Sequence, residues 1–116
     1  MLVEDEDLYR DLLRIVLDQQ PRLQVVGAFG DAASALEAAP TLKPDVAMLD
    51  IELRGTMNGI QLGLKLRETM PEVGIVLLSN LGDPQFLSSL PPEAAGGWSY
   101  LLKKSVGDAD TLSRAI

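Results

Sequence analysis

Three acidic side chains follow two short apolar runs, each at the point where the run ends. Glu4 and Asp5 come directly after Met1–Val3, and Asp50 comes directly after Val46–Leu49. Carboxylates repel one another at close range, so one of them takes up a proton unless a cation joins the group. Oxygen ligands are those that Mg²⁺ prefers, and Mg²⁺ needs few from the protein because it keeps several waters. The acids therefore predict a magnesium site.

A hydroxyl and a lysine follow two further apolar runs in the same way. Ser79 comes after Ile75–Leu78, and Lys103 comes after Trp98–Leu102. A serine hydroxyl can donate a hydrogen bond to a phosphoryl oxygen, and a lysine supplies a point charge for the same group. A nucleophilic carboxylate, a metal, a lysine and a hydroxyl donor together are equipped for phosphoryl transfer.

Composition excludes several other kinds of chemistry. The 116 residues include no cysteine and no histidine. This excludes disulfides, zinc–thiolate sites, serine–histidine triads and an internal phosphohistidine relay. The formal net charge of -7 argues against direct nucleic-acid binding, which needs a basic surface. No apolar run reaches the roughly 18 residues that span a bilayer, and no signal peptide is evident, so we expect a cytoplasmic protein without a membrane partner.

Short apolar runs alternate with segments of helical spacing along the whole chain. The runs are rich in Val, Leu and Ile and predict buried strands at Met1–Val3, Leu23–Ala28, Val46–Leu49, Ile75–Leu78 and Trp98–Leu102. Between them, apolar residues at helical spacing predict stripes that face the core: Leu8, Leu12, Ile15 and Val16; Ala32, Ala35, Leu36 and Ala39; Ile60, Leu62, Leu64 and Leu66; and, at the end of the chain, Leu112 and Ile116. Arg67 continues the spacing of Ile60 and Leu64 as the charged end of the third stripe.

Boundary residues agree with this alternation. Asp31 and Asn58 are expected to cap the second and third helices, and Pro21, Pro40 and Pro71 to end the first three. Strand and helix repeated five times predict an α/β sandwich with right-handed crossovers. In such sheets ligands bind outside the carboxyl ends of the strands, where the polar side chains fall.

The motifs at these strand ends resemble those of a known family. Val3-Glu4-Asp5, Leu49-Asp50-Ile51, Leu78-Ser79 and Tyr100-Leu101-Leu102-Lys103 together are similar to the motif set of bacterial two-component response-regulator receiver domains, over essentially the whole chain. The likeness is greatest to receivers fused to helix-turn-helix DNA-binding domains. The resemblance implies a flavodoxin-like three-layer sandwich with five helices and a five-stranded parallel sheet of order 2-1-3-4-5.

The resemblance also implies a role for each site residue. Asp50 would be the phospho-acceptor, served by Lys103 and Ser79, and Ser79 and Tyr100 would be the switch hydroxyl and switch aromatic. Mg²⁺ would be held by Asp5 directly, by Glu4 through water, by Asp50, and by the backbone carbonyl of Glu52.

Four features depart from the family pattern. Lys104 stands where a proline usually follows the lysine, and Leu53-Arg54 replaces a methionine–proline pair in a loop one residue longer than usual. Asn80 stands where a small residue is usual. The stretch from Ser79 to Lys103 is about two residues too long and carries Pro91-Pro92 and Gly96-Gly97. These prolines predict a short or irregular fourth helix, from Asp83 to near Leu90.

The leading functional hypothesis is a phosphorylation-dependent receiver that takes a phosphoryl group from a histidine kinase onto Asp50 and switches an output, transcription. Self-association into a homodimer on phosphorylation is expected by the same resemblance. We expect one domain over residues 1–116, trimmed at both ends, with any output domain beyond Ile116. An alternative is a receiver that binds its partner without phosphorylation. A phosphohydrolase is less favoured, because such enzymes usually carry an aspartate where this chain has Glu52, so we expect no enzymatic turnover.

Overall fold

Five parallel strands form a single sheet in the order β2-β1-β3-β4-β5, as predicted. The computed structural model describes residues 1–55, 57–79 and 98–103. The strands are β1 (Leu2–Val3), β2 (Ala28–Phe29), β3 (Val46–Asp50), β4 (Gly74–Ser79) and β5 (Trp98–Leu102). β5 has the bounds that the sequence predicted, and β3 and β4 are each slightly longer than expected.

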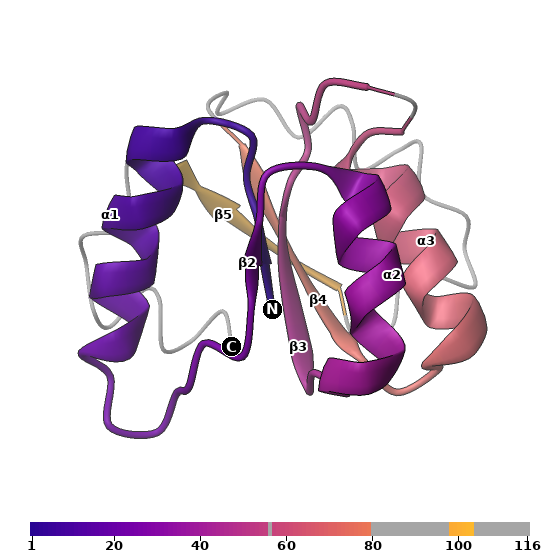
Figure 1. The fold of residues 1–116 in the computed structure, drawn as a ribbon, viewed down its shortest axis with the longest axis horizontal. Coiled ribbons are helices and arrows are strands. Elements are labelled where there is room, and N and C mark those ends of the chain that lie inside the picture. The colour runs from indigo at the N-terminus through magenta and orange to yellow at the C-terminus, as the bar shows by residue number, and fades with distance from the viewer. Residues whose placement is uncertain (56, 80–97, 104–116) are drawn as a thin grey trace.

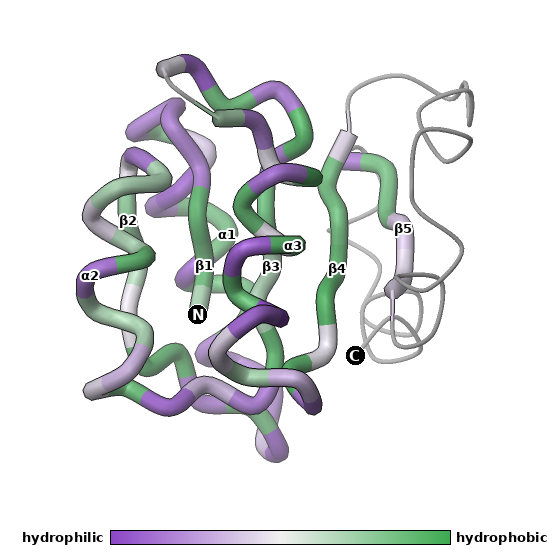
Figure 2. The backbone as a smooth tube through the Cα atoms, turned by 90° about the vertical axis from the view of Figure 1, so that its right-hand side faces the viewer, coloured by the Kyte–Doolittle hydropathy of each residue, from purple (hydrophilic) through white to green (hydrophobic). Residues whose placement is uncertain are grey.

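Helices cover both faces of this sheet, which gives the predicted three layers (Figure 1). α1 (Asp7–Asp18) lies on one face, and α2 (Ala32–Leu42) and α3 (Gly59–Thr69) lie on the other. Each face has its own apolar core, because alternate side chains of a strand point to opposite faces. The α1 side contains Leu2, Leu13, Leu17, Met48, Val76, Leu78 and Leu101, and the other side includes Val3, Ala35, Leu49, Leu62, Leu66, Ile75 and Leu77. Hydrophobic residues accordingly run along most of β4 in Figure 2.

The second strand is much shorter than predicted. A strand was expected over Leu23–Ala28, but only Ala28 and Phe29 pair with β1. β1 offers only Leu2 and Val3 as partners, so the ladder is two residues long. Apolar residues before it, such as Leu23 and Val25, pack against the α1 side of the core without being part of the sheet.

The buried face of α1 differs from the predicted one. Leu8, Leu12 and Ile15 were expected to face the core, but their exposed fractions are 78%, 56% and 57%. Leu13 and Leu17 are buried instead, and Tyr9 packs against their cluster. Val16, the fourth residue of the predicted stripe, packs against the same cluster as expected. The helix carries two apolar stripes of nearly equal quality, and periodicity alone does not say which of them packs on the sheet.

Pro40 does not end the second helix, contrary to the prediction. α2 continues to Leu42 and closes at Lys43, which has a positive φ of 49° and donates its backbone N–H to Ala39. A proline inside a helix removes one backbone donor and crowds the preceding turn. Here only two residues of helix follow Pro40, so the distortion affects only the end of the helix.

The other boundary predictions are confirmed. Asp31 caps α2 by accepting the backbone N–H of Ser34, and Asn58 caps α3 in a reciprocal arrangement with Gln61. α1 and α3 end at Asp18 and Thr69, before Pro21 and Pro71. On α3, Ile60, Leu62 and Leu66 are buried as expected, Leu64 is half-buried, and Arg67 donates to the Val73 carbonyl.

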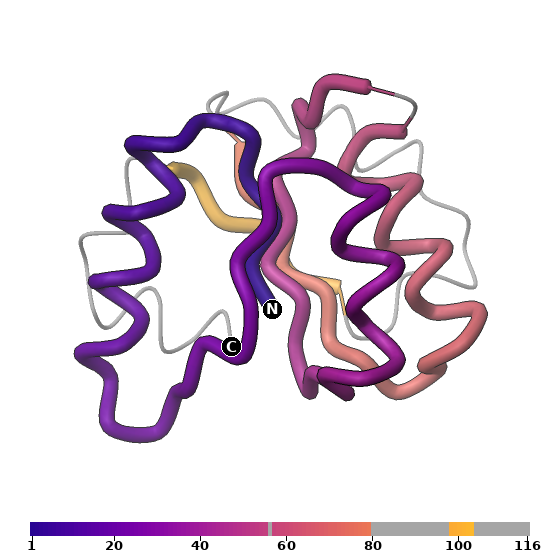
Figure 3. Tube along the Cα trace, viewed as in Figure 1, coloured from indigo at the N-terminus to yellow at the C-terminus, as the bar shows by residue number. Residues whose placement is uncertain are grey.

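All five strands run in one direction, so their carboxyl ends share one edge of the sheet. The loops that follow β1 and β3 emerge together at this edge, at the top of Figure 3. The predicted fourth helix from Asp83 to Leu90 and the last helix with Leu112 and Ile116 lie outside the described residues. No helix in the described part of the chain is long and apolar enough to cross a membrane.

Candidate functional site

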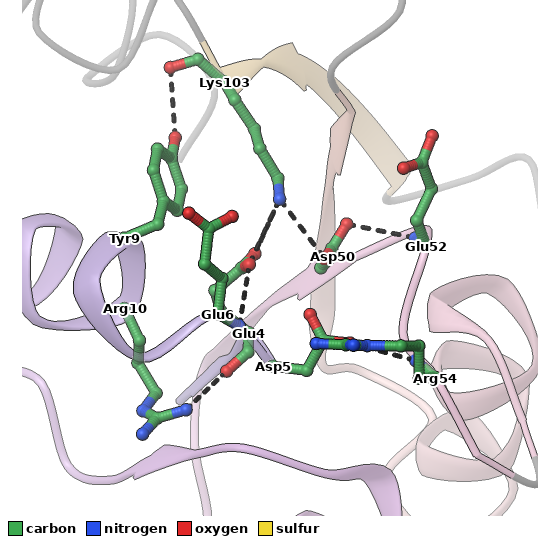
Figure 4. Close-up of polar contacts among 9 residues, drawn as sticks. All are labelled: Glu4, Asp5, Glu6, Tyr9, Arg10, Asp50, Glu52, Arg54 and Lys103. Atoms are coloured by element: carbon green, nitrogen blue, oxygen red, sulfur yellow. Dashed lines mark hydrogen bonds and ion pairs between the residues drawn. The ribbon is translucent and has the colours of Figure 1, made fainter.

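Lys103 joins two of the predicted acids at the carboxyl edge of the sheet (Figure 4). Its Nζ lies 3.0 Å from Oε2 and 3.1 Å from Oε1 of Glu4, and 3.2 Å from Oδ2 of Asp50. The three side chains are almost fully buried, at 8%, 0% and 3% exposure respectively. Burial strengthens the mutual attraction of such charges, and removal of one partner leaves the others uncompensated. This contact ties the end of β5 to the ends of β1 and β3.

Glu4 has the most strongly shifted carboxyl group of the cluster. Burial raises the pKa of Glu4 to about 7, and the hydrogen bond from Lys103 opposes that rise. The nearby charge of Asp50 raises the pKa further. For Lys103 the balance is reversed: burial alone would lower its pKa, but Glu4 and Asp50 outweigh burial and raise the pKa above its ordinary value. Lys103 is therefore a permanent cation at neutral pH.

Tyr9 holds Lys103 from the α1 side, a role that the sequence did not reveal. Its hydroxyl donates to the backbone carbonyl of Lys103 at 3.0 Å, and Lys103 Nζ lies 4.9 Å from the ring centroid. Burial and the charges of Glu4 and Asp50 raise the pKa of Tyr9, so the phenol keeps the proton that it donates. A cation over an aromatic face is itself stabilised. The sole sequence signal is an aromatic residue one turn into the first helix.

Asp5, the third acid, pairs with a different cation. Its Oδ2 accepts the side-chain Nε–H of Arg54 at 2.9 Å and the backbone N–H of Arg54 at 3.2 Å. Partial burial raises the pKa of Asp5, but Arg54 outweighs burial and holds that pKa below its ordinary value. Arg54 was noticed in the sequence as a departure from the family pattern, but its contact with Asp5 was not foreseen.

The backbone around Asp50 is packed tightly. Asp50 ends β3, and its Oδ1 accepts the backbone N–H of Glu52 at 3.0 Å. Gly59, the first residue of α3, lies so close to the Asp50 carbonyl that a Cβ there would collide with it. The sequence thus places a glycine where a helix terminus must approach the backbone of the acceptor candidate.

The donor set fits a magnesium ion. Glu4, Asp5 and Asp50 each offer a carboxylate oxygen, and these oxygens lie within 4.8 Å of one another. A small, hard cation prefers such oxygen ligands and completes its octahedron with water. The three acids that the sequence singled out for a metal are therefore brought together.

The other predicted site residues are Ser79 on β4, Tyr100 on β5 and Glu52 just after β3, and their roles stay predictions. Ser79 is buried at the end of β4, in register with Leu102, and Tyr100 is half-buried on β5, opposite Leu77. The Glu52 side chain is exposed, and Figure 4 shows its carboxylate turned away from Asp50. That orientation does not suit the general acid–base of a phosphohydrolase, which must reach the reacting group.

The parallel sheet of order β2-β1-β3-β4-β5 and the acidic cluster at its carboxyl edge are those of the receiver class of domains. The chain matches the response regulator receiver domain family over residues 1–116, and it belongs to that family. The family resemblance inferred from the motifs is thereby confirmed.

The chain is similar to transcriptional regulators and to methylesterases. The chain is 36% identical over 116 residues to the DNA-binding transcriptional activator DevR/DosR of Mycobacterium tuberculosis, covering 99% of this chain and 51% of the relative. It is 35% identical over 113 residues to a protein-glutamate methylesterase/protein-glutamine glutaminase of Vibrio vulnificus, covering 97% of this chain and 32% of the relative. A LuxR-family response regulator from Aurantimonas superposes with a TM-score of 0.84 at 25% identity, covering 99% of this chain and 79% of that one.

These relatives are longer proteins with different activities. The chain spans about half of the activator's length and about a third of the methylesterase's. Transcriptional regulators and methylesterases thus share this domain, and membership of the family does not by itself define the output.

Proposed function

We propose that this chain is a phosphorylation-dependent receiver of a two-component system, in which Asp50 accepts a phosphoryl group from a partner histidine kinase. The observation that carries the proposal is the buried contact of Lys103 with Asp50 and Glu4 at the carboxyl edge of the sheet. A carboxylate next to a fixed cation and two further acids is suited to nucleophilic attack on phosphorus with metal assistance.

In the proposed transfer, an Asp50 carboxylate oxygen forms a bond to phosphorus while the bond from phosphorus to the kinase histidine nitrogen breaks. The nitrogen keeps the electron pair of that bond. Lys103 supplies positive charge to the phosphoryl oxygens, and the Ser79 hydroxyl donates a hydrogen bond to them. Ser79 and Tyr100 are proposed to report the change to the surface of the domain.

The proposed metal ligands are Asp5 directly, Glu4 through water, Asp50, and the backbone carbonyl of Glu52. Bound Mg²⁺ would neutralise negative charge on the transferring group. We expect Asp5→Asn to lose most of the magnesium affinity while the fold is retained, because a ligand charge is removed from a partly exposed position. Unchanged affinity in a calorimetric titration would remove Asp5 from the ligand set.

The acceptor is tested by incubating the protein with Mg²⁺ and a small acyl phosphate, followed by intact-mass measurement. Wild type should gain one phosphoryl group, and Asp50→Ala should gain none. Asp11→Ala, at an exposed position on α1, is the matched control and should be labelled like wild type. Failure of wild type to be labelled, or equal labelling of Asp50→Ala, would contradict the proposal.

The output and partners are proposed by analogy with relatives. We propose transcriptional control, with DNA bound by a separate domain beyond Ile116 rather than by this acidic chain. The histidine kinase is the proposed phosphoryl donor, the cytoplasm the proposed location, and no catalytic turnover is expected of the domain.

A second function is favoured by one observation, the ion pair between Arg54 and Asp5. An arginine on a magnesium ligand suits a receiver that binds its partner without phosphorylation. The clustering of Glu4, Asp50 and Lys103 favours the first proposal instead. Partner binding that is unchanged in Asp50→Ala, together with no measurable magnesium binding, would support the second function.

A further inference from the structure

Arg54 binds one oxygen of Asp5 with two donors from the same residue. The side-chain Nε lies 2.9 Å and the backbone N lies 3.2 Å from Asp5 Oδ2. The contact joins the loop after β1 to the loop after β3, across 49 positions of sequence. Figure 4 shows the guanidinium lying beside the Asp5 carboxylate at the edge of the cluster.

The charges of the cluster are divided between two cations. Lys103 contacts Glu4 and Asp50, and in the described part of the chain Arg54 is the basic side chain paired with Asp5. The two cations differ in exposure to solvent: the side chain of Lys103 is 8% exposed and that of Arg54 is 85% exposed. Arg54 can therefore leave its partner at little cost, whereas Lys103 cannot.

A magnesium ion at Asp5 would meet this guanidinium at close range. Metal–oxygen distances of about 2.1 Å place Mg²⁺ within a few ångströms of the Arg54 charge, whichever Asp5 oxygen it takes. Like charges at that separation repel, and the repulsion is largest at low ionic strength. Because Arg54 is exposed, water weakens the repulsion but does not abolish it.

We propose that Arg54 is an internal counter-ion that competes with magnesium for Asp5 and so sets the magnesium concentration at which the Asp50 pocket is filled. This inference rests on the proposed function, since it concerns the metal of that pocket. When magnesium binds, the guanidinium swings into solvent, while the Arg54 backbone N–H remains available to the carboxylate.

The test is calorimetric titration of the protein with magnesium chloride at low ionic strength, without any phosphoryl donor. Arg54→Gln removes the charge and keeps the backbone donor, and it should bind magnesium about two- to tenfold more tightly than wild type. Arg54→Lys keeps the charge and should stay close to wild type. Arg22→Gln removes an exposed arginine before β2, at the amino edge of the sheet, and should also match wild type.

Two further measurements make the result specific. In an Asp5→Asn background, Arg54→Gln should change magnesium affinity much less, because the shared carboxylate is gone. Added potassium chloride should reduce the difference between wild type and Arg54→Gln. Equal affinity of these two proteins would overturn the proposal. Weaker binding by Arg54→Gln would also overturn it, and would make Arg54 a residue that orients Asp5 for the metal.

The magnesium titration of Arg54→Gln and the phosphorylation of Asp50 test different statements, so one can fail without the other. If Asp50 is phosphorylated in wild type but Arg54→Gln leaves magnesium affinity unchanged, this inference fails and the proposed function stands. If neither protein binds magnesium and neither is phosphorylated, both fail.

Discussion

At the scale of single residues, buried charged side chains form the centre of the site, and neighbouring side chains hold them in place. Lys103 has one ammonium group for two carboxylates, and its position depends on Tyr9 as well as on Glu4 and Asp50. A long, flexible lysine loses much side-chain entropy when it is fixed, so a rigid aromatic support beside it is useful.

Tyr9→Phe should destabilise the protein by about 0.5 to 1.5 kcal/mol, because it leaves the Lys103 carbonyl without the phenol donor while the ring remains. Tyr9→Leu should cost more, since it also removes the contact between ring and ammonium. Denaturant unfolding measures both changes. If Tyr9→Phe has the same free energy of unfolding as wild type, a water molecule replaces the phenol as donor to the Lys103 carbonyl without loss of stability.

The raised pKa of Glu4 predicts a pH dependence of stability. Its folded pKa of about 7 lies above the ordinary value of 4.5, so the folded protein binds a proton more tightly than the unfolded chain. The stabilisation from that proton is present below pH 4.5 and is lost as pH rises to about 7. Glu4→Gln cannot titrate, so its stability relative to wild type should increase across that range.

The Glu4 measurement is made by denaturant unfolding in the presence of a chelator, at about pH 5.5 and about pH 8. Losing the ion pair with Lys103 also changes the free energy of unfolding of Glu4→Gln. The part of that change that does not depend on pH cancels when the difference from wild type is compared between the two pH values. A stability difference between Glu4→Gln and wild type that is the same at both pH values would contradict the raised pKa.

At the scale of elements, α1 shows how tertiary packing decides between two equivalent helix faces. Leu13→Ala should cost about 2 to 5 kcal/mol, because it empties a site buried to 1% exposure. Leu12→Ala, the matched control, lies 56% exposed on the other stripe and should cost far less. Similar unfolding free energies for the two variants would mean that α1 is rotated from its described position.

The close approach of α3 to β3 gives a second matched pair. Gly59→Ala should destabilise the domain and slow labelling of Asp50, because its Cβ would push against the Asp50 carbonyl. Gly74 is the first residue of β4, and a Cβ there would meet its nearest atom at 3.5 Å, so Gly74→Ala should be tolerated. Unfolding and acyl-phosphate labelling of both variants test this. Normal labelling of Gly59→Ala would show that the loop shifts without disturbing the acceptor.

What the sequence could predict depends on whether the signal is local. The strand Trp98–Leu102 and the caps Asp31 and Asn58 were correctly predicted, because a short, mostly apolar run or a single side chain determines each of them. The face of α1 and the length of β2 depend on what the neighbouring elements offer, and these predictions were wrong. The gathering of Glu4, Asp5, Asp50 and Lys103 followed from strand direction, but the Arg54 and Tyr9 contacts depend on side-chain directions that spacing does not encode.

At the scale of the whole molecule, we predict self-association when Asp50 is phosphorylated, by resemblance to the family. Repulsion between copies that each carry a charge of -7 opposes association, so moderate salt should favour it. Sedimentation with and without beryllofluoride, in the presence of Mg²⁺, measures the change. A monomer under both conditions at high protein concentration would end this idea for the isolated domain.

The exposed apolar stripe of Leu8, Leu12 and Ile15 has a consequence for how the protein aggregates. At neutral pH the protein carries a net charge of -7, and repulsion between molecules keeps the exposed apolar stripe of α1 from causing association. Near the isoelectric point of about 4.4 that repulsion vanishes, while the apolar stripe stays exposed. Aggregation in mild acid should therefore begin with contacts between the α1 helices of folded molecules, and it should not require unfolding of the core.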